Sequence, residues 1–349
     1  MSEADCGMRA ARRPTGGDAP GPGGSHNDSG TLMVDPVTNT QESEMLREVR
    51  AGLSRPQKEL SPKFFYDHRG SELFEEITTL PEYYLTRAER RLLRSRADEI
   101  ARAAGARALV ELGAGSAEKT RILLDAMLAG GGAAMYVPVD VSASFLADSA
   151  DRLAAEYPDL TIAPVVADFT AGFMPPRAMP RPAMFAFLGS TIGNFDPPAA
   201  LRLLSRVRRV MHPGDTLLLG ADLRKDIGRI EAAYNDSRGV TAEFNRNMLH
   251  VLNRELGADF DPEAFEHRAF FADDESRIEM HLVSKRDQEA RIPGMPPVRL
   301  AAGESIRTEI SCKYERSTLE DLLERARLRV THWYELADEG YAITLAAPA

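Results

Sequence analysis

The stretch Val110-Glu-Leu-Gly-Ala-Gly-Ser116, followed by Val137-Pro-Val-Asp140, decides the fold of this chain. Residues 109–112 have the pattern of a buried strand, and residues 120–127 have the apolar spacing of a helix packed on a sheet. The glycines therefore fall in a strand-to-helix turn, where the backbone can approach a ligand closely. Asp140 stands at the tip of the next strand, where a carboxylate can accept hydrogen bonds from both ribose hydroxyls. We expect a pocket for a cofactor that contains adenosine.

Neighbouring residues favour S-adenosylmethionine over a nicotinamide dinucleotide as this cofactor. A dinucleotide fingerprint has a third glycine at the position of Glu118, where a carboxylate suits a pyrophosphate poorly. An acid just before the first glycine, Glu111, and the pair Asp168-Phe169 after the third strand fit S-adenosylmethionine better. Asp168 can bind the adenine amino group and Phe169 can stack on the ring. Taken alone, the glycines could also form a tight turn without a ligand.

Composition limits the kinds of partner. The 349 residues suit two domains, or one domain with a large insertion. A formal net charge of −10 argues against a nucleic-acid partner, because phosphate binding needs clustered Lys and Arg. Two distant cysteines, Cys6 and Cys312, and histidines without ligand spacing predict neither disulfides nor a metal site. Without a signal peptide or an apolar run of about 18 residues, we expect a cytoplasmic protein without membrane contact.

The segments before the glycine turn predict a tail and then a helix. Residues 1–43 are rich in Gly, Pro, Ser, Asp and Asn, and we expect a disordered tail there. Two segments with tyrosines follow, at 63–67 and 80–85. Thr86 and Glu89 have the spacing of a capping box, which predicts that a helix starts there and ends at Gly105.

After the turn, strands and helices alternate, which specifies a parallel sheet with helices on both faces. A loop at 189–195 follows one of these strands at its carboxyl end, where such folds bind ligands. Asp196 predicts the start of the helix that comes next. The expected strands are 136–140, 161–167, 184–188 and 216–220, and the expected helices are 142–157 and 199–211.

The alternation is lost between about residues 224 and 311, which indicates an insertion that forms a second domain. The chain then resumes with a helix and a hairpin, and a terminal hairpin beside a parallel sheet is typical of methyltransferases rather than dehydrogenases. The expected elements are helices 227–234 and 241–256, strand 277–283, helix 318–326, and strands 329–335 and 341–346.

From about residue 55 onward, the chain resembles the histidine Nα-methyltransferases of ergothioneine biosynthesis. Leu85 departs from the family motif, which has proline there, and the tail is not covered by the resemblance. Six motifs in order carry it: Phe64-Phe-Tyr-Asp-His-Arg-Gly-Ser71, Leu80-Pro-Glu-Tyr-Tyr-Leu-Thr-Arg-Ala-Glu89, Glu111-Leu-Gly-Ala-Gly-Ser-Ala-Glu-Lys-Thr120, Leu188-Gly-Ser-Thr-Ile-Gly-Asn194, Gly239-Val-Thr-Ala-Glu-Phe-Asn-Arg-Asn247 and Thr308-Glu-Ile-Ser-Cys-Lys313.

The resemblance implies an α/β fold: a class I S-adenosylmethionine-dependent methyltransferase (Rossmann-like) domain with an inserted α+β substrate-binding domain. We expect the methyltransferase domain at 89–223 and 315–349, and the substrate-binding domain at 44–88 and 224–314. The implied reaction trimethylates the α-amino group of L-histidine to hercynine, through mono- and dimethylated intermediates. We expect the protein to be a monomer.

The family's functional residues are carried over by motif. The resemblance implies that the cofactor is held by Gly113, Lys119, Asp140, Asp168 and Phe169. It implies that the amino and carboxylate groups of histidine meet Tyr66, Tyr83, Asn194 and Tyr234, and that the imidazole meets Thr241, Glu309 and Ser311, with Met280 shaping the pocket.

The chemistry of methyl transfer supports these roles. Displacement at a sulfonium needs the free lone pair of a neutral amine, so the protein must align the nitrogen and needs no strong base. Asn194 and Tyr66 can do so, and we expect them to be catalytic. Glu309 and Ser311 are two apart in an extended segment and share a face, so they can hold both ring nitrogens. A methyltransferase for another amino-acid amine would lack this pair, and a sensor that only binds S-adenosylmethionine would show no turnover.

Overall fold

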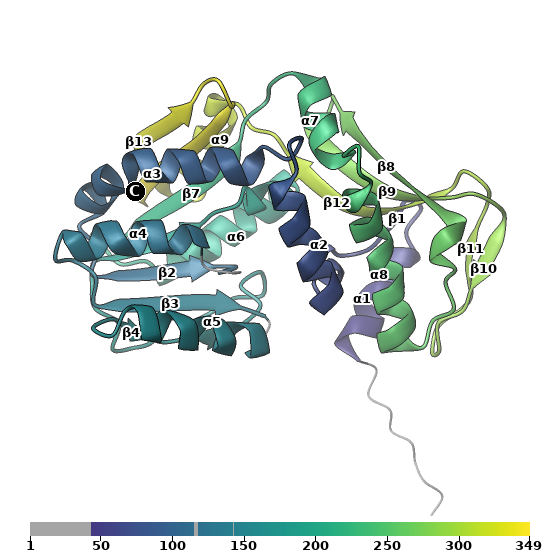
Figure 1. Cartoon of the computed structure of the whole chain (residues 1–349), viewed down its shortest axis with the longest axis horizontal. Helices are drawn as coiled ribbons and strands as arrows, with labels where there is room; N and C mark the ends of the chain where they lie inside the picture. Colours follow the sequence, from purple (N-terminus) through teal and green to yellow (C-terminus); the bar gives the residue numbers. More distant parts are fainter. Residues whose placement is uncertain (1–42, 115–117, 142) are drawn as a thin grey trace, which may run out of the picture. The chain divides into compact units, whose positions relative to one another are not determined.

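An eight-stranded sheet leads into the predicted cofactor turn at Gly113 and Ala114, while Gly115 and Ser116 of that turn lie outside the described residues (Figure 1). The structure is a computed structural model that describes residues 43–114, 118–141 and 143–349. The predicted tail therefore lies outside the described residues, except for Ser43. The strands of this large sheet are β2 (Ala108–Leu112), β3 (Met135–Asp140), β4 (Thr161–Ile162), β5 (Val165–Val166), β6 (Ala183–Phe187), β7 (Thr216–Asp222), β13 (Leu328–Leu336) and β14 (Tyr341–Pro348).

The strand order confirms the predicted fold class. The order is β13-β14-β7-β6-β2-β3-β4, and β5 also pairs with β3. Neighbours from β4 to β7 run parallel, whereas β14 is antiparallel to β7 and β13 is antiparallel to β14. A parallel sheet whose strand order reverses at a central strand, here β2, and which has an antiparallel terminal hairpin at one edge, is the class I methyltransferase arrangement.

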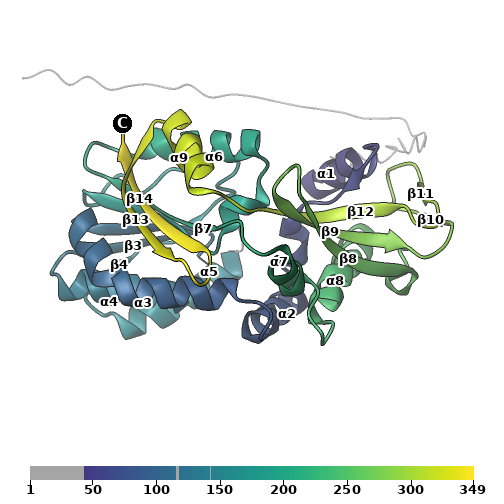
Figure 2. The ribbon, with the colours of Figure 1, turned by 90° about the horizontal axis from the view of Figure 1, so that it is seen from above.

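Helices cover both faces of the large sheet, as Figure 2 shows. Leu109 points to one face and packs with Leu93 of α3, whereas Val110 points to the other and belongs to the same cluster as Leu203 of α6. Because both faces are buried, the strands are almost continuously apolar. One face is covered by α3 (Leu85–Ala104), α4 (Glu118–Ala129) and α5 (Ala143–Glu156), and the other by α6 (Pro197–Val210) and α9 (Arg316–Arg325).

A second, four-stranded sheet is formed by the predicted insertion together with the segment before α3. Its order is β1-β12-β9-β8, and α8 packs against it with an apolar core of its own. The boundaries of the two predicted domains stay a prediction. The elements are α1 (Glu44–Leu53), β1 (Lys58–Glu59), η1 (Pro62–Phe65), α2 (His68–Thr79), α7 (Ile227–Tyr234), α8 (Val240–Leu256), η3 (Pro262–Ala264), β8 (Phe265–Ala272), β9 (Arg277–Ser284), β10 (Gln288–Ala290), β11 (Val298–Leu300) and β12 (Ser305–Cys312).

The chain has two adjacent passages between the two sheets, besides the one that leads from β1 through α3 to β2. It leaves the large sheet after β7 and returns after β12, and a parallel bridge joins Leu223 to Tyr314 at this point. The ends of β7 and β12 are therefore held side by side. The last residue of β7, Asp222, and the residue after β12, Lys313, form an ion pair there at 3.0 Å.

Several predicted helix ends are confirmed. Helix α7 has the predicted bounds, and α3 ends at Gly105, whose φ of +54° suits glycine. Asp196 caps α6, since its side chain accepts a hydrogen bond from the backbone N–H of Ala199 at 2.7 Å. None of the helices in the described ranges is long and apolar enough to span a membrane.

The predicted capping box is wrong. The N-cap of α3 is Tyr84, which makes no side-chain capping bond, so the helix begins before Thr86. Glu89 has no exposed surface and turns away from the helix end, toward the large sheet. Leu85 occupies the first helical position, where a proline also fits, so this departure from the motif leaves the local backbone intact. The run 161–167 was also predicted as one strand, but it forms β4 and β5.

Candidate active site

The predicted cofactor residues stand at the carboxyl edge of the large sheet. Gly113 follows β2 with a φ of +71°, and its backbone N–H donates to the carbonyl of Val139 at 2.8 Å. A Cβ on Gly113 would lie 3.7 Å from the Phe169 ring, so the bare backbone keeps the space beside that ring open. Asp140 ends β3, one strand away. The structure thus brings Gly113, a carboxylate and an aromatic ring to one edge.

Asp168 is held in place by Thr170, two residues further along the chain. Its Oδ1 accepts from the backbone N–H of Thr170 at 2.8 Å and from the Thr170 hydroxyl at 2.5 Å. Burial alone would raise the pKa of this carboxyl, but the bonds from Thr170 and Ala171 outweigh it and lower the pKa. Asp168 is therefore a carboxylate with a fixed orientation next to Phe169.

Lys119 lies at the start of α4 and is tied to a buried carboxylate. Its Nζ donates to Glu89 at 2.5 Å, and the other Glu89 contacts are the backbone N–H of Gly189 at 2.7 Å and the Tyr341 hydroxyl at 2.6 Å. Gly189 begins the loop after β6, and a Cβ there would lie 3.3 Å from the Lys119 ammonium. Glu89 therefore anchors three segments and holds Lys119 against the loop that leads to Asn194.

The predicted tyrosines form one wall of aromatic rings. Tyr66 and Tyr83 each contact Phe74 edge-on, with ring centroids 5.7 Å and 6.2 Å apart, and Tyr83 contacts Tyr234 at 6.4 Å. Phe244 of α8 supports Tyr66 at 5.9 Å. Edge-to-face contacts of this kind fix the rings while leaving the hydroxyls of Tyr66 and Tyr83 available. The sequence analysis did not identify Phe74, which joins the two tyrosine segments.

Four predicted substrate residues make no side-chain hydrogen bond or ion pair within the described part of the chain: Tyr66, Tyr83, Asn194 and Glu309. Tyr66 is 51% exposed, yet desolvation by the surrounding protein raises the pKa of its hydroxyl, and Glu309, Tyr234 and Asp140 raise it further. Since solvent reaches Tyr66 although protein surrounds it, we infer that this side chain lines a cleft. Because the charges of both Glu309 and Asp140 act on Tyr66, this side chain is near a predicted substrate residue and a predicted cofactor residue.

Glu309 faces this cleft from β12. Burial raises the pKa of its carboxyl to about 7, and only the positive charge of Lys313 opposes the rise. The strand has a β-bulge between Arg307 and Glu309, after which Glu309 pairs with Met280 and Ser311 pairs with Ile278. Glu309 and Ser311 therefore share a face, as predicted. Met280 lies beside Glu309 but is only 1% exposed, so it packs under the cleft.

Ser311 contacts Tyr234, although the two residues were expected at opposite ends of histidine. The Tyr234 hydroxyl lies 3.0 Å from Ser311 Oγ, although Tyr234 was assigned to the amino-acid end and Ser311 to the imidazole end. The two ends of the predicted pocket therefore meet here. Thr241 is buried at the start of α8, and its hydroxyl makes no hydrogen bond of ordinary geometry with a described residue.

The loop after β6 packs tightly on β12 through a glycine. A Cβ on Gly193 would lie 2.8 Å from the carbonyl oxygen of Cys312 and 3.2 Å from Ser311 Oγ. Only glycine therefore lets η2 (Thr191–Asn194) approach β12 this closely. This contact places Asn194 next to the strand that bears Ser311.

Three residues of this region were missed by the sequence analysis: Glu89, Asp222 and Lys313. The sequence did indicate Lys313, because it is two residues after Ser311 in an extended segment and so continues the face of Glu309 and Ser311. No local sequence pattern indicated Asp222 or Glu89, since their partners are distant in sequence. Glu111 was expected to be a feature of an S-adenosylmethionine site, but it is buried and accepts hydrogen bonds from Thr120 and Tyr136; burial raises its pKa to about 7.

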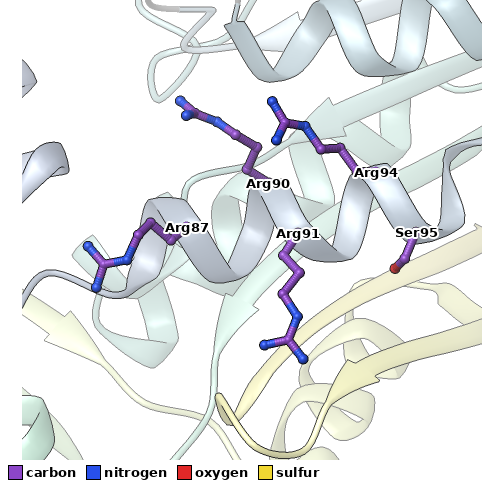
Figure 3. A pocket seen from close by; sticks show the side chains of 5 residues that line it. All are labelled: Arg87, Arg90, Arg91, Arg94 and Ser95. Carbon is purple, nitrogen blue, oxygen red and sulfur yellow. The ribbon is translucent and has the colours of Figure 1, made fainter. Parts of the chain in front are cut away.

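A separate hollow on α3 is lined by arginines and is not the site. Figure 3 shows Arg90 and Arg94 pointing away from Arg91 rather than converging on one point. Arg87 donates to the carbonyls of Leu80 and Pro81, and Arg91 pairs with Asp338. No residue predicted to bind substrate or cofactor lines this hollow.

Comparisons with known proteins agree on one family. Residues 45–348 match the profile of the family described as "Histidine-specific methyltransferase, SAM-dependent". The chain is 48% identical over 301 residues to the Histidine N-alpha-methyltransferase of Mycolicibacterium smegmatis, covering 86% of this chain and 94% of that protein. It is 46% identical over 303 residues to the Histidine N-alpha-methyltransferase of Mycobacterium tuberculosis, with the same two coverages. It is 30% identical over 299 residues to Ergothioneine biosynthesis protein 1 of Neurospora crassa, covering 79% of this chain and 32% of that protein.

Proposed function

Because the chain belongs to the family of histidine-specific, S-adenosylmethionine-dependent methyltransferases, we propose that it methylates the α-amino group of L-histidine three times to give hercynine. The product would serve ergothioneine biosynthesis, the process named in the Neurospora crassa relative.

The observation that carries this proposal is the placement of Glu309 and Ser311. They share one face of β12, and Glu309 has no hydrogen-bond partner among the described residues. Leaving a half-buried carboxyl unpaired is costly, so a ligand that brings an N–H to Glu309 gains affinity over one that does not. An imidazole supplies that N–H and a second ring nitrogen for Ser311, whereas an apolar side chain supplies neither.

The cofactor edge fits S-adenosylmethionine, which supplies an electrophilic methyl group on a sulfonium when bound. In this proposal Asp140 binds the ribose hydroxyls, Asp168 the adenine amino group, and Phe169 the face of the adenine. The open space beside Gly113 suits a close approach to the backbone. Lys119, with one proton used by Glu89, keeps two for the carboxylate of the cofactor.

Tyr66 and Asn194 would orient the amine as the catalytic residues. The nitrogen must be neutral, and it must lose a proton before each further transfer. Because the pKa of Tyr66 is raised, its hydroxyl stays protonated and acts as a hydrogen-bond partner rather than as a base. Asn194 offers a neutral oxygen that accepts an N–H without favouring the ammonium form. Solvent that reaches Tyr66 can accept the released proton.

The remaining roles complete the proposal. Tyr83 and Tyr234 would bind the amino-acid end of histidine, Thr241 would assist at the imidazole, and Met280 would support Glu309 from below. We further propose a cytoplasmic monomer that retains the mono- and dimethylated intermediates, with segments 44–88 and 224–314 acting as the substrate-binding domain. A chain with only two cysteines suits a reducing compartment.

Mass spectrometry tests the reaction. The purified protein is incubated with S-adenosylmethionine and each common amino acid in turn, and the mass gain is recorded. Three methyl groups on histidine alone are expected. Methylation of another amino acid instead would retain the fold and the mechanism but contradict the assignment of Glu309 and Ser311. Cofactor binding without turnover of any amine would indicate a sensor.

A further inference from the structure

Lys313 contacts two residues that are proposed to bind the substrate. Its side chain is fully buried, and its Nζ lies 3.0 Å from Asp222 Oδ2, 3.1 Å from Ser311 Oγ and 3.1 Å from the Tyr234 hydroxyl. An ammonium has three protons, so these three acceptors use all of them. Lys313 therefore has no proton left for a ligand and acts only through its neighbours.

These contacts determine whether Ser311 donates or accepts a hydrogen bond with a ligand. The Tyr234 hydroxyl donates to Ser311 Oγ at 3.0 Å, as expected because a phenol is a stronger donor than an alkyl hydroxyl. Ser311 Oγ thus accepts one hydrogen bond from Tyr234 and one from Lys313. A serine oxygen has two acceptor positions and one proton. Only the proton remains available to a ligand.

We propose that Lys313 and Asp222 are positioning residues that hold Ser311 as a hydrogen-bond donor, so that the site selects the neutral form of the imidazole ring. This inference rests on the proposed function. A neutral ring has one N–H for Glu309 and one bare nitrogen for Ser311. A protonated ring has N–H groups at both nitrogens, and one of them would meet an oxygen whose acceptor positions are already filled.

The cations around Ser311 act in the same direction. Asp222 is shared, because it also binds Lys225 and accepts from Tyr84 at 2.6 Å. Lys225 and Arg229 both lie over the Tyr84 ring, at 4.0 Å and 4.7 Å from its centroid. The single carboxylate of Asp222 thus faces several cations, and a charged imidazolium beside Ser311 would be repelled by Lys313. Glu309 is the acidic group proposed to face the other nitrogen of the ring, and burial raises its pKa to about 7.

The test compares histidine with an analogue whose ring is 1,2,4-triazole, which stays neutral where imidazole becomes protonated. The measured quantity is the KM of histidine divided by the KM of the analogue, from pH 5.5 to 7.5. The titration of Glu309 and of the α-amino group affects both ligands and largely cancels in this ratio. For the wild-type protein we expect the ratio to rise about tenfold as the pH falls, following an imidazole pKa of about 6.5.

Lys313→Met frees an acceptor position on Ser311, so the imidazolium can bind and the ratio should stay within about twofold over the same range. The matched control is Lys225→Met, which removes a cation from the same Asp222 carboxylate without touching Ser311 or Tyr234. We expect this control to keep the tenfold rise. A merely structural role of Lys313 would lower activity but would leave the ratio as it is in the wild type.

Removing one member of a buried ion pair can prevent folding, because the other charge is left unpaired. The double variant Asp222→Asn with Lys313→Met removes both charges and gives the same expected ratio. A tenfold rise that persists in either folded variant overturns the inference, and so does a flat ratio in the wild-type protein. Absence of histidine methylation by the wild-type protein would instead overturn the proposed function.

Discussion

The cofactor edge of the large sheet and the cleft wall formed by the small sheet and its loops differ in how their polar groups are paired. At the cofactor edge, Lys119 is held by Glu89, and Asp168 is held by Thr170. On the cleft wall, Glu309 has no hydrogen-bond partner among the described residues, and the same is true of Tyr66. In the first region these side chains are organised before a ligand arrives, whereas Glu309 and Tyr66 in the second keep their polar groups for the ligand. Substitutions should therefore act through neighbours in the first region, and directly on the ligand at Glu309 and Tyr66.

Glu309→Ala should show the largest effect and should separate the two regions. It removes the proposed partner of the ring N–H, so histidine affinity should fall by roughly tenfold to a hundredfold, the loss expected for a charged hydrogen bond of about 1.5–3 kcal/mol. Cofactor affinity should hardly change. Isothermal titration calorimetry with each ligand measures both.

The matched control for this variant is Glu266→Ala, an exposed acid on β8 of the same small sheet. It should leave both affinities unchanged. Equal losses of histidine and cofactor affinity in Glu309→Ala would mean that the two regions do not bind their ligands separately.

Gly193→Ala tests the contact at which the two regions meet. The added Cβ would lie 2.8 Å from the Cys312 carbonyl oxygen, so η2 must move away from β12. We expect a loss of about 1–3 kcal/mol in the free energy of unfolding, as for other overpacked positions, and a lower kcat because Asn194 moves with η2. Urea unfolding and steady-state kinetics measure the two effects.

Gly130→Ala is the comparison for this variant. The Cβ there would make ordinary contacts, the nearest at 3.5 Å, and the position is remote from the cleft. Its stability and kcat should match the wild type. A stable, fully active Gly193→Ala would show that the close approach of η2 and β12 is not needed.

Glu89→Gln should affect mainly the cofactor edge. The substitution keeps the shape of the side chain but removes the charge that holds Lys119. Lys119 should then be less well oriented, and we expect cofactor affinity to fall about tenfold, equivalent to roughly 1.4 kcal/mol. Histidine affinity should fall less. Calorimetry that finds the greater loss for histidine would contradict the assignment of Glu89 and Lys119 to the cofactor.

The same contrast explains what the sequence could predict. The cofactor edge depends on a short motif, and Gly113, Asp140 and Phe169 stand at the expected strand ends because parallel strands align their carboxyl ends. The helix α7 and the shared face of Glu309 and Ser311 also follow from local periodicity.

What failed was local reasoning about residues whose partners are distant in sequence. Glu89 has the spacing of a capping residue from Thr86, but burial against Gly189 and Tyr341, about 100 and 250 residues away, decides its role. The ion pair of Asp222 and Lys313 likewise depends on the return of the chain beside β7. Local patterns carry no information on such pairs.

The smallest expected effect concerns the pH dependence of stability that an unpaired Glu309 produces. Its pKa of about 7 is above the ordinary 4.5, so the folded protein binds more protons than the unfolded chain between these values. The stability that Glu309 contributes is therefore fully present below about pH 4.5 and is lost as the pH rises through about 7.

Glu309→Gln stays neutral, so its Tm should rise relative to the wild type between about pH 5 and pH 7.5. Saturating histidine should reduce this difference, because a ring N–H stabilises the carboxylate. Differential scanning calorimetry measures the Tm of both proteins with and without histidine. A Tm difference that stays constant with pH would mean that Glu309 is solvated like a surface acid. That result would remove the contrast between the two regions.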